Sequence, residues 1–334
     1  MNRTPTAPEP AVVIGLSAVV VAIRDGEAAV LTVRQHDPAT GEASQLRGLP
    51  FGPFDPQGHR TFELALRAFV TEQTRFDLGY VEQLYTFGDK GRDAPIADMG
   101  AGSRARVISV GYLALTPTAI DTTAPDTEWT ALSRFFPWED WRDGRPAALE
   151  PIAAALRRWS MAAGGAEGAR RQAGMRLLFA QDGAVWNEER VLERYELLYE
   201  AGLAPEAIRD RGESPPLDAQ AFAALGEPML SDHRRILATG LSRLRGKLKY
   251  RPVVFELMPE AFTLSALQRT VEAIAGVPLH KQNFRRALER AELVEGLGRL
   301  DAETGGRPAE LFRFRREILG ARPVSGLSLP LLRD

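Results

Sequence analysis

The chain is 334 residues long, enough for two or three domains, and it is 44% hydrophobic and 26% charged, which excludes a wholly disordered protein. It contains no cysteine, which excludes disulfides, thiolate metal sites and a cysteine nucleophile. Residues 231–334 hold 19 Lys and Arg against 12 Asp and Glu, whereas the rest of the chain is acidic. The basic C-terminal part therefore predicts an anionic partner, with nucleic acid as the first candidate and a solvated charged face as the alternative.

The N-terminal region begins with a proline-rich stretch, residues 1–10, which we expect to be a flexible tail. The apolar run at residues 11–23 is too short to span a membrane. Asp25-Gly26 follows it, and a second apolar run covers residues 28–33, so the pattern predicts a β-hairpin rather than a signal peptide. We expect no membrane segment and a cytoplasmic location.

Residues 11–141 alternate between helical and strand-like patterns. A helix is predicted over residues 60–73, where Phe62, Leu66 and Phe69 fall on one side. Strands are predicted over residues 80–87 and 106–115, with a loop over residues 88–103 between them. An α+β domain results, with a helix packed on an open or mixed sheet.

Residues 142–230 are rich in Ala and Glu and predict a helical insertion. Within it we expect a helix that begins at Asn187 as N-cap and ends before Gly202, and loops at residues 163–174 and 212–216. Residues 231–249 predict a connecting helix capped by Ser231.

The pattern of residues 250–320 predicts a winged helix-turn-helix, and residues 321–334 predict a C-terminal tail. A first amphipathic helix follows from Leu264, Leu267, Val271 and Ile274, with Thr263 or Ser265 as its cap and Gly276 at its end. Strands at residues 293–301 and 309–315 flank a Gly-rich turn and form the predicted wing.

A second helix in this region has the composition of a DNA-recognition helix. Phe284 and Leu288 predict its buried side, while cationic and amide side chains occupy the other side. Arg and Lys donate hydrogen bonds to guanine edges or phosphates, and Gln and Asn pair with adenine. The candidate DNA contacts on the helix and the wing are Lys281, Gln282, Asn283, Arg285, Arg286, Arg290 and Arg307. Arginines on an ordinary surface helix are the alternative.

Three stretches of the chain carry a family resemblance. They are Gln83-Leu84-Tyr85-Thr86-Phe87-Gly88-Asp89, residues 106–115 and residues 250–315, the last including Asn283-Phe284-Arg285-Arg286 and Gly306-Arg307-Pro308-Ala309. In these stretches the chain resembles the Nudix-related transcriptional regulators of NAD metabolism called NrtR. The resemblance implies a Nudix-like α/β/α sandwich with a mixed sheet at residues 11–141 and a winged helix at residues 250–320. The insertion at residues 142–230 departs from the family pattern.

The Nudix box of this chain is degenerate. A working box has the pattern G-x5-E-x7-R-E-U-x-E-E-x-G-U, where U is aliphatic, and its glutamates hold Mg²⁺. When Arg67 is aligned with the arginine of the box, Ala68 and Thr71 occupy two of the glutamate positions, and Glu72 is the one box glutamate that remains. A single carboxylate does not build a magnesium cluster, so we expect no catalytic residues, no metal site and no required cofactor. An ordinary surface glutamate is the alternative for Glu72.

The resemblance implies a homodimeric regulator, expected to be a repressor, that binds double-stranded promoter DNA of NAD biosynthesis and salvage genes. Its effector would be ADP-ribose or a related NAD-derived nucleotide, bound in a non-catalytic domain. Candidate effector contacts are Arg47, Phe51, Phe54, Arg67, Glu72, Asp89, Arg92 and Arg106. One alternative is an ADP-ribose or nucleotide-sugar pyrophosphatase with an atypical metal site. Another is a regulator whose pocket takes a different ligand.

Overall fold

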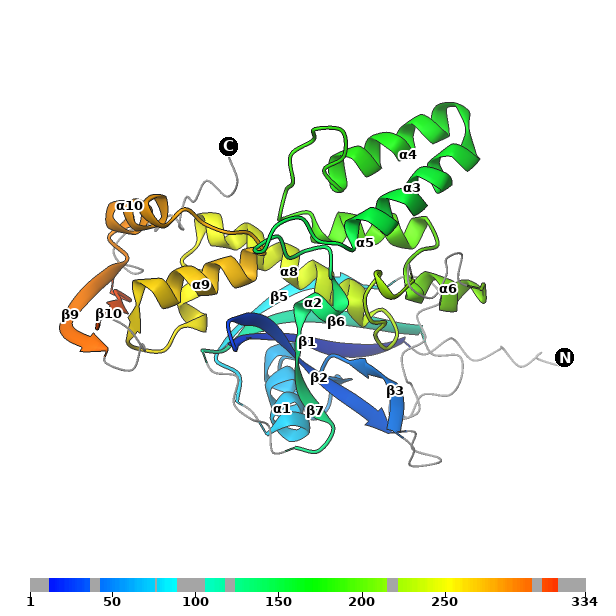
Figure 1. The fold of residues 1–334 in the computed structure, drawn as a ribbon. Helices are drawn as coiled ribbons and strands as arrows, with labels where there is room; N and C mark the ends of the chain where they lie inside the picture. The colour runs from blue at the N-terminus through cyan, green and yellow to red at the C-terminus, as the bar shows by residue number, and fades with distance from the viewer. Residues whose placement is uncertain are drawn as a thin grey trace, which may run out of the picture.

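The computed structural model describes residues 12–36, 43–75, 77–88, 106–117, 124–214, 222–301 and 308–317. The expected tails at residues 1–10 and 321–334 lie outside these ranges. The N-terminal part is built on one seven-stranded sheet (Figure 1). Its strands are β1 (Val12–Arg24), β2 (Glu27–His36), β3 (Ala43–Gly48), β4 (Phe51–Pro53), β5 (Tyr80–Phe87), β6 (Arg106–Leu115) and β7 (Thr127–Ala131).

The sheet is mixed, as predicted. Its main path runs β3-β2-β1-β6-β5, with β4 paired to β1 and β7 paired to β2. Strands β1 and β6 are parallel, and the other pairs are antiparallel. The predicted hairpin is confirmed at the β1–β2 turn, where Asp25 and Gly26 both adopt positive φ angles of 51° and 80°. Two successive positive φ angles are typical of tight two-residue hairpins.

Helices cover both faces of this sheet (Figure 1). Helix α1 (Phe62–Thr74) packs on one face, and α2 (Leu132–Phe135) and α8 (His233–Tyr250) pack on the other. Strand β1 is buried on both sides, because Ala18 and Val20 face α1 while Val19 and Val21 face α8. This two-sided burial explains the nearly continuous apolar run that the sequence shows there.

Helix α1 confirms the helix predicted over residues 60–73. Its N-cap is Thr61, whose hydroxyl accepts a hydrogen bond from the backbone N–H of Leu64 at 3.2 Å. It ends at Arg75, which adopts the left-handed conformation with a φ of 54°. Leu66 and Phe69 form part of its buried side, as the spacing predicted.

The helical segment contains α3 (Leu149–Ala163), α4 (Gly165–Leu178), α5 (Val191–Glu200) and α6 (Pro205–Arg211). Two predictions here were wrong. Residues 163–174 were expected to form a loop, but most of them belong to α4, because the chain turns at Gly164, with a φ of 63°, and packs α4 against α3. Asn187 does not cap a helix; it accepts a hydrogen bond from the Glu189 N–H at 3.0 Å, and α5 begins four residues after Asn187.

Helix α8 confirms the connecting helix but not its predicted cap. Ser231 has a φ of 50°, which is not the geometry of an N-cap, and Asp232 occupies the cap position. The apolar side of α8 (Ile236, Leu237, Leu241 and Leu244) is fully buried between the sheet and the helical segment. A short 3-10 helix, η2 (Val253–Leu257), follows.

The C-terminal region has the predicted winged-helix order. It contains β8 (Phe262–Thr263), α9 (Leu264–Ala275), α10 (Lys281–Ala291), β9 (Val294–Asp301) and β10 (Ala309–Phe314), with β10 between β8 and β9. Thr263 caps α9 by accepting a hydrogen bond from the Ala266 N–H at 3.1 Å, and Gly276 ends it with a φ of 68°. The rings of Phe255 and Phe314 stack with centroids 4.1 Å apart and hold η2 against β10.

One hydrophobic core runs from the α8 side of the sheet through the helical segment into the winged helix. It contains Val19 of β1, Leu241 of α8, Tyr195 of α5 and Ile274 of α9. The winged helix is therefore packed directly on the rest of the protein. None of the helices in the described ranges has both the length and the apolar character needed to cross a membrane.

Candidate functional site

The outer side of α10 presents the candidate DNA contacts. Phe284 and Leu288 are 1% and 2% exposed, so they fix α10 on the domain. The side chains of Lys281, Gln282, Asn283, Arg285, Arg286 and Arg290 are exposed. The structure thus gathers on one helix face all the predicted DNA contacts except Arg307, which lies outside the described residues.

Most of the charge on this face is not neutralised within the protein. Among the described residues, Lys281, Arg285 and Arg286 form no side-chain hydrogen bond or ion pair, whereas Arg290 donates from Nε to the carbonyl oxygen of Arg286 at 3.2 Å. Exposed guanidinium groups without carboxylate partners are suited to phosphates and guanine edges.

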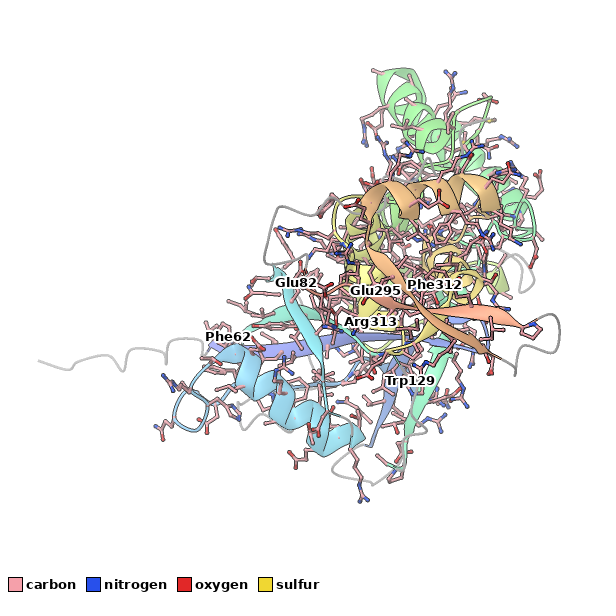
Figure 2. The ribbon with its side chains drawn as sticks, turned by 90° about the vertical axis from the view of Figure 1, so that its left-hand side faces the viewer. Phe62, Glu82, Trp129, Glu295, Phe312 and Arg313 are labelled. Atoms are coloured by element: carbon pink, nitrogen blue, oxygen red, sulfur yellow. The ribbon has the colours of Figure 1, made fainter. Side chains whose placement is uncertain are left out.

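A hollow lies between α10, the start of α9 and the wing. Its lining includes Ser265 of α9, Lys281 and Arg285 of α10, and Phe312 of β10. Figure 2 shows the wing strands beside α10, with Glu295, Phe312 and Arg313 labelled. Glu295 and Arg313 are directly opposite each other on β9 and β10 and form an ion pair. The charges of these two side chains therefore neutralise each other.

The candidate effector residues that the structure describes fall into two groups on opposite faces of the sheet. Phe54 lies on the α1 side, where its ring meets that of Phe62 edge-on with centroids 4.5 Å apart. Phe51 lies on the α8 side, where its ring centroid is 5.1 Å from that of His233. Between them, Gly52 faces the ring of Phe69 on α1. The two phenylalanine rings therefore do not form a single aromatic surface.

On the α1 side, Arg67 is engaged with its own domain. Its Nε donates to Glu63 at 3.0 Å, and its other nitrogens donate to the carbonyl oxygens of Leu78 and Gly79. Arg67 therefore holds the segment that leads into β5. Glu72 is exposed, and its side chain has no hydrogen bond or ion pair among the described residues.

On the other side, Arg47 forms an ion pair with Glu128 of β7. Glu128 also pairs with Arg134 of α2 at 3.4 Å, and Arg134 pairs with Glu227 at 2.8 Å. Arg47 is thus at the end of a partly exposed chain of alternating charges.

Three further effector predictions cannot be placed in the structure. Asp89 and Arg92, together with the side chain of Arg106, lie outside the described residues.

The residues of α1 do not fit a magnesium ion. Ala68 and Thr71 offer no carboxylate where a working Nudix box carries glutamates, and the Thr71 hydroxyl donates to Asp77 at 3.0 Å. Across the described ranges, no three His, Asp or Glu side chains gather closely enough to hold a metal ion. Mg²⁺ requires oxygen ligands in nearly octahedral geometry, and Glu72 alone does not provide them.

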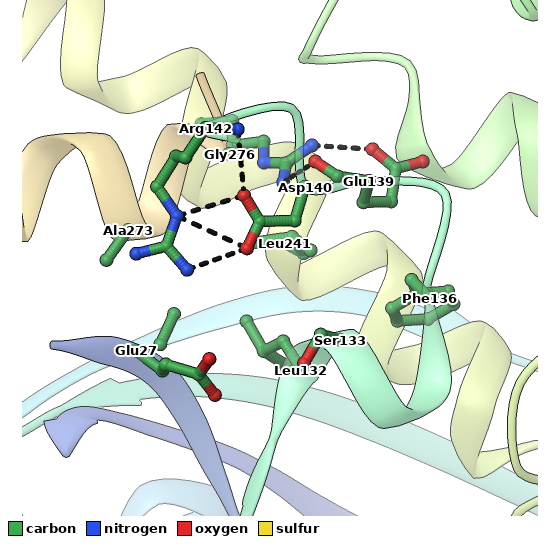
Figure 3. Close-up of a pocket in the computed structure, with 12 residues that line it drawn as sticks. Glu27, Leu132, Ser133, Phe136, Glu139, Asp140, Arg142, Leu241, Ala273 and Gly276 are labelled. Atoms are coloured by element: carbon green, nitrogen blue, oxygen red, sulfur yellow. Dashed lines mark hydrogen bonds and ion pairs between the residues drawn. The ribbon is translucent and has the colours of Figure 1, made fainter. Parts of the chain in front are cut away.

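A buried charge cluster, which the sequence did not reveal, links the segment after α2 to α5 and α8, and Figure 3 shows its Glu139. The carboxylate of Glu139 accepts hydrogen bonds from Arg194 of α5 at 2.5 and 2.7 Å and from Arg245 of α8 at 2.6 Å. Arg245 also donates from Nε to the carbonyl oxygen of Ile274 in α9 at 2.8 Å. Burial lowers the pKa of Arg245 and Glu139 opposes this, but a guanidinium stays cationic throughout the physiological range.

Residues 139–142 form a seam that also contacts the end of α9 and the β1–β2 turn. The backbone N–H of Trp141 donates to the carbonyl oxygen of Gly276 at 2.6 Å. Arg142 donates to the Gly26 carbonyl in the β1–β2 turn at 2.9 Å and pairs with Asp140 at 2.6 Å. Burial would raise the pKa of Asp140, but hydrogen bonds from Arg142 outweigh it and hold that pKa below its ordinary value. The seam therefore ties the hairpin of the sheet to the winged helix.

Helix α8 is also tied to the edge strand β5. Lys247 forms an ion pair with Glu82, and the hydroxyl of Tyr80 donates to the same carboxylate at 2.5 Å. Burial would raise the pKa of Glu82, but hydrogen bonds from Lys247 and Tyr80 outweigh it and lower that pKa. Burial likewise opposes the charge on Lys247, yet Glu82 raises its pKa above the ordinary value. Both partners thus remain charged.

The chain is similar to known proteins in both sequence and fold. Residues 254–314 match the family described as the NrtR DNA-binding winged helix domain. The C-terminal domain is therefore similar to NrtR winged helices over these residues. The chain is also similar to the ADPR responsive transcriptional repressor NtrR of Acinetobacter baylyi, with 37% identity over 91 residues. That match spans 27% of this chain and 36% of the relative, so it covers about a third of the relative's length.

Solved structures extend the likeness to the whole fold. The chain resembles Shewanella oneidensis NrtR complexed with a 27mer DNA, with a TM-score of 0.52, 21% identity and coverage of 90% of this chain and 93% of that one. It also resembles a MutT/nudix family protein from Enterococcus faecalis, with a TM-score of 0.50, 16% identity and coverage of 94% and 90%. The chain therefore shares the fold of these structures, with a domain built on a mixed sheet followed by a winged helix.

Proposed function

We propose that this protein is a DNA-binding transcriptional regulator, acting as a repressor, whose Nudix-like domain senses ADP-ribose or a related NAD-derived nucleotide. The observation that carries the proposal is the exposed face of α10, where Lys281, Arg285 and Arg286 stand in an NrtR-type winged helix without side-chain partners among the described residues. In a winged helix, such a face enters the major groove of DNA.

The relatives support the choice of partner and effector. The Acinetobacter baylyi relative is described as ADPR responsive and as a transcriptional repressor, and the Shewanella oneidensis NrtR structure contains DNA. We extend both properties to this chain and propose NAD biosynthesis and salvage genes as its targets. The division into a sensing domain at residues 11–141, a helical insertion at 142–230, a connecting helix at 231–249 and a winged helix at 250–320 is part of the proposal.

The proposed effector contacts are those predicted from the sequence. Arg47 and Phe51 would act on the α8 side and Phe54, Arg67 and Glu72 on the α1 side, while Asp89, Arg92 and Arg106 are proposed from the sequence alone. Since Arg67 holds three internal hydrogen bonds, we expect it to stabilise the site rather than to contact the nucleotide directly. The domain would bind the nucleotide without cleaving it, because α1 lacks the carboxylates for Mg²⁺.

The protein would act as a homodimer, since winged-helix regulators read half-sites that are related by twofold symmetry. Binding of the nucleotide must then favour an arrangement in which the two reading helices no longer match the half-sites. A ligand with equal affinity for both arrangements would shift nothing.

A gel-shift titration at fixed salt tests this function. The full chain should bind promoter fragments from NAD biosynthesis genes, and ADP-ribose should weaken that binding. Incubation with ADP-ribose and Mg²⁺ should release no AMP at an enzymatic rate. Absence of DNA binding would refute the regulator, whereas brisk hydrolysis would favour the pyrophosphatase. If another nucleotide weakened DNA binding and ADP-ribose did not, that nucleotide would be the effector.

A further inference from the structure

Helix α8 makes specific contacts at both of its ends. His233 is in its first turn and Arg245 is twelve residues further along, about 18 Å along the helix axis. His233 contacts the segment that carries two of the proposed effector residues, and Arg245 contacts the winged helix. An 18-residue helix without proline is stiff on this scale, so a displacement at one end is carried to the other.

At its N-terminal end, α8 grips the turn between β3 and β4. The Nδ1 of His233 accepts a hydrogen bond from the backbone N–H of Leu49 at 3.0 Å, and its ring meets that of Phe51 edge-on. The fit is tight, because a Cβ added to Gly48 would lie 2.9 Å from Nδ1. One residue before Gly48, the carbonyl oxygen of Arg47 accepts from the Leu230 N–H at 2.9 Å.

At its other end, α8 holds the end of α9. Arg245 is 3% exposed, and its guanidinium donates to Glu139, to the carbonyl oxygen of Glu188 and to the carbonyl oxygen of Ile274. A Cβ added to Gly276 would lie 2.7 Å from this guanidinium. Because α9 and α10 are joined by a short turn, the position of Arg245 sets where α10 presents its cationic face.

From this geometry we propose that α8 transmits nucleotide binding at the Arg47–Phe51 segment to the DNA-reading helix, with His233 as the relay contact at one end and Arg245 at the other. The inference rests on the proposed function and specifies its regulation. A nucleotide phosphate that draws Arg47 away from Glu128 would shift the backbone of residues 47–51. The shift would reach His233 through Leu49 and Phe51. Helix α8 would carry it to Arg245, which would change the position of α9. Packed interfaces of this kind switch between discrete arrangements.

His233 variants test the relay. His233→Leu removes the acceptor for the Leu49 N–H at similar volume, His233→Asn keeps an acceptor near the Nδ1 position, and His233→Gln keeps polarity but moves the acceptor. The matched control is Arg243→Gln, an exposed change on the same helix. For each protein, the DNA dissociation constant is measured with and without saturating ADP-ribose at fixed salt, and the affinity for ADP-ribose is measured by calorimetry.

The wild-type ratio of the two DNA dissociation constants should lie within the usual range for allosteric coupling, roughly 5–150-fold. It should fall to about 1 in His233→Leu and His233→Gln, while Arg243→Gln and His233→Asn keep it to within about threefold. ADP-ribose should still bind every variant. Without DNA, it should change hydrogen exchange of the amides at residues 272–276 in the wild type but not in His233→Leu.

The possible failures are distinguishable. If the wild type does not bind DNA or does not respond to ADP-ribose, the proposed function fails and the relay fails with it. If the wild type responds and both the Leu and Gln variants respond equally, only the relay is refuted. Loss of ADP-ribose binding in a folded variant would also refute it, since His233 would then be a binding residue. If His233→Leu does not fold, the ratio of the two DNA dissociation constants in His233→Gln tests the relay instead.

Discussion

Arg245 donates a hydrogen bond from its Nε to the carbonyl oxygen of Ile274 at 2.8 Å. The last carbonyl groups of a helix have no partner within that helix. In α9 one of them is satisfied by a residue outside the winged helix, and the next residue but one, Gly276, is bonded by Trp141. The end of α9 is therefore held by Arg245 and Trp141, two residues outside the winged helix.

The buried carboxylate of Glu139 should be essential for stability. Glu139→Gln would leave Arg194 and Arg245 buried without their anionic partner, and we expect a loss of about 3–5 kcal/mol in the free energy of unfolding. Urea titration followed by circular dichroism measures it. The control is Glu167→Gln, which removes exposed ion pairs to Arg170 and Arg171 and should change stability little. Equal effects of the two changes would contradict the importance of burial.

Gly276 should be more sensitive to substitution than another glycine with similar backbone geometry. A Cβ there would lie 2.2 Å from the Glu139 carbonyl oxygen, whereas Gly183 has a φ of 78° and open space around it. Gly183→Ala should cost about 1–2 kcal/mol from the left-handed backbone alone. Gly276→Ala should cost about 2–5 kcal/mol, because overpacking adds to that strain. Thermal unfolding measures the loss of stability in each variant. Similar losses would mean that the residues around Gly276 shift easily to make room for the added Cβ.

The α10 face should determine DNA affinity. If Arg286 pairs with a guanine, Arg286→Ala should cost about 1–3 kcal/mol and relax specificity at one base pair. Arg285→Ala, next to the hollow, should weaken binding to all sequences and reduce the salt dependence. Gel-shift titrations at several salt concentrations measure both effects. Arg158→Ala, an exposed change on α3, is the matched control. A double Arg285/Arg286 variant that kept full affinity would mean that another surface reads the DNA.

Magnesium should have no role in effector binding. The affinity for ADP-ribose is expected to be the same in MgCl₂ and in EDTA, because α1 keeps Glu72 but not the other carboxylates of the box. Calorimetry under the two conditions is the measurement. Glu72→Gln should also leave DNA binding intact. If ADP-ribose bound more tightly with Mg²⁺ and Glu72→Gln abolished that gain, Glu72 would belong to a metal site. Loss of DNA binding in Glu72→Gln would mean that the effector site, or its coupling to DNA binding, is assigned wrongly.

Local patterns predicted much of the fold. The hairpin at Asp25-Gly26, the helix predicted over residues 60–73, and α9 with its end at Gly276 all follow from contacts within a few residues. The helix α4 was missed because its glycines and alanines carry little periodic signal, and it is held by packing against α3. Asn187 was misassigned because an Asx turn and an N-cap use the same residue types.

By itself, the sequence determined the order of helices and strands in the winged helix and the cationic face of α10, because the period of apolar residues and the capping residues are local properties. Only the tertiary structure decided that Phe51 and Phe54 lie on opposite faces of the sheet, and that Glu139, Arg194 and Arg245 meet. Such contacts join segments far apart in the chain, and no local periodicity encodes which buried charges find each other when the chain packs.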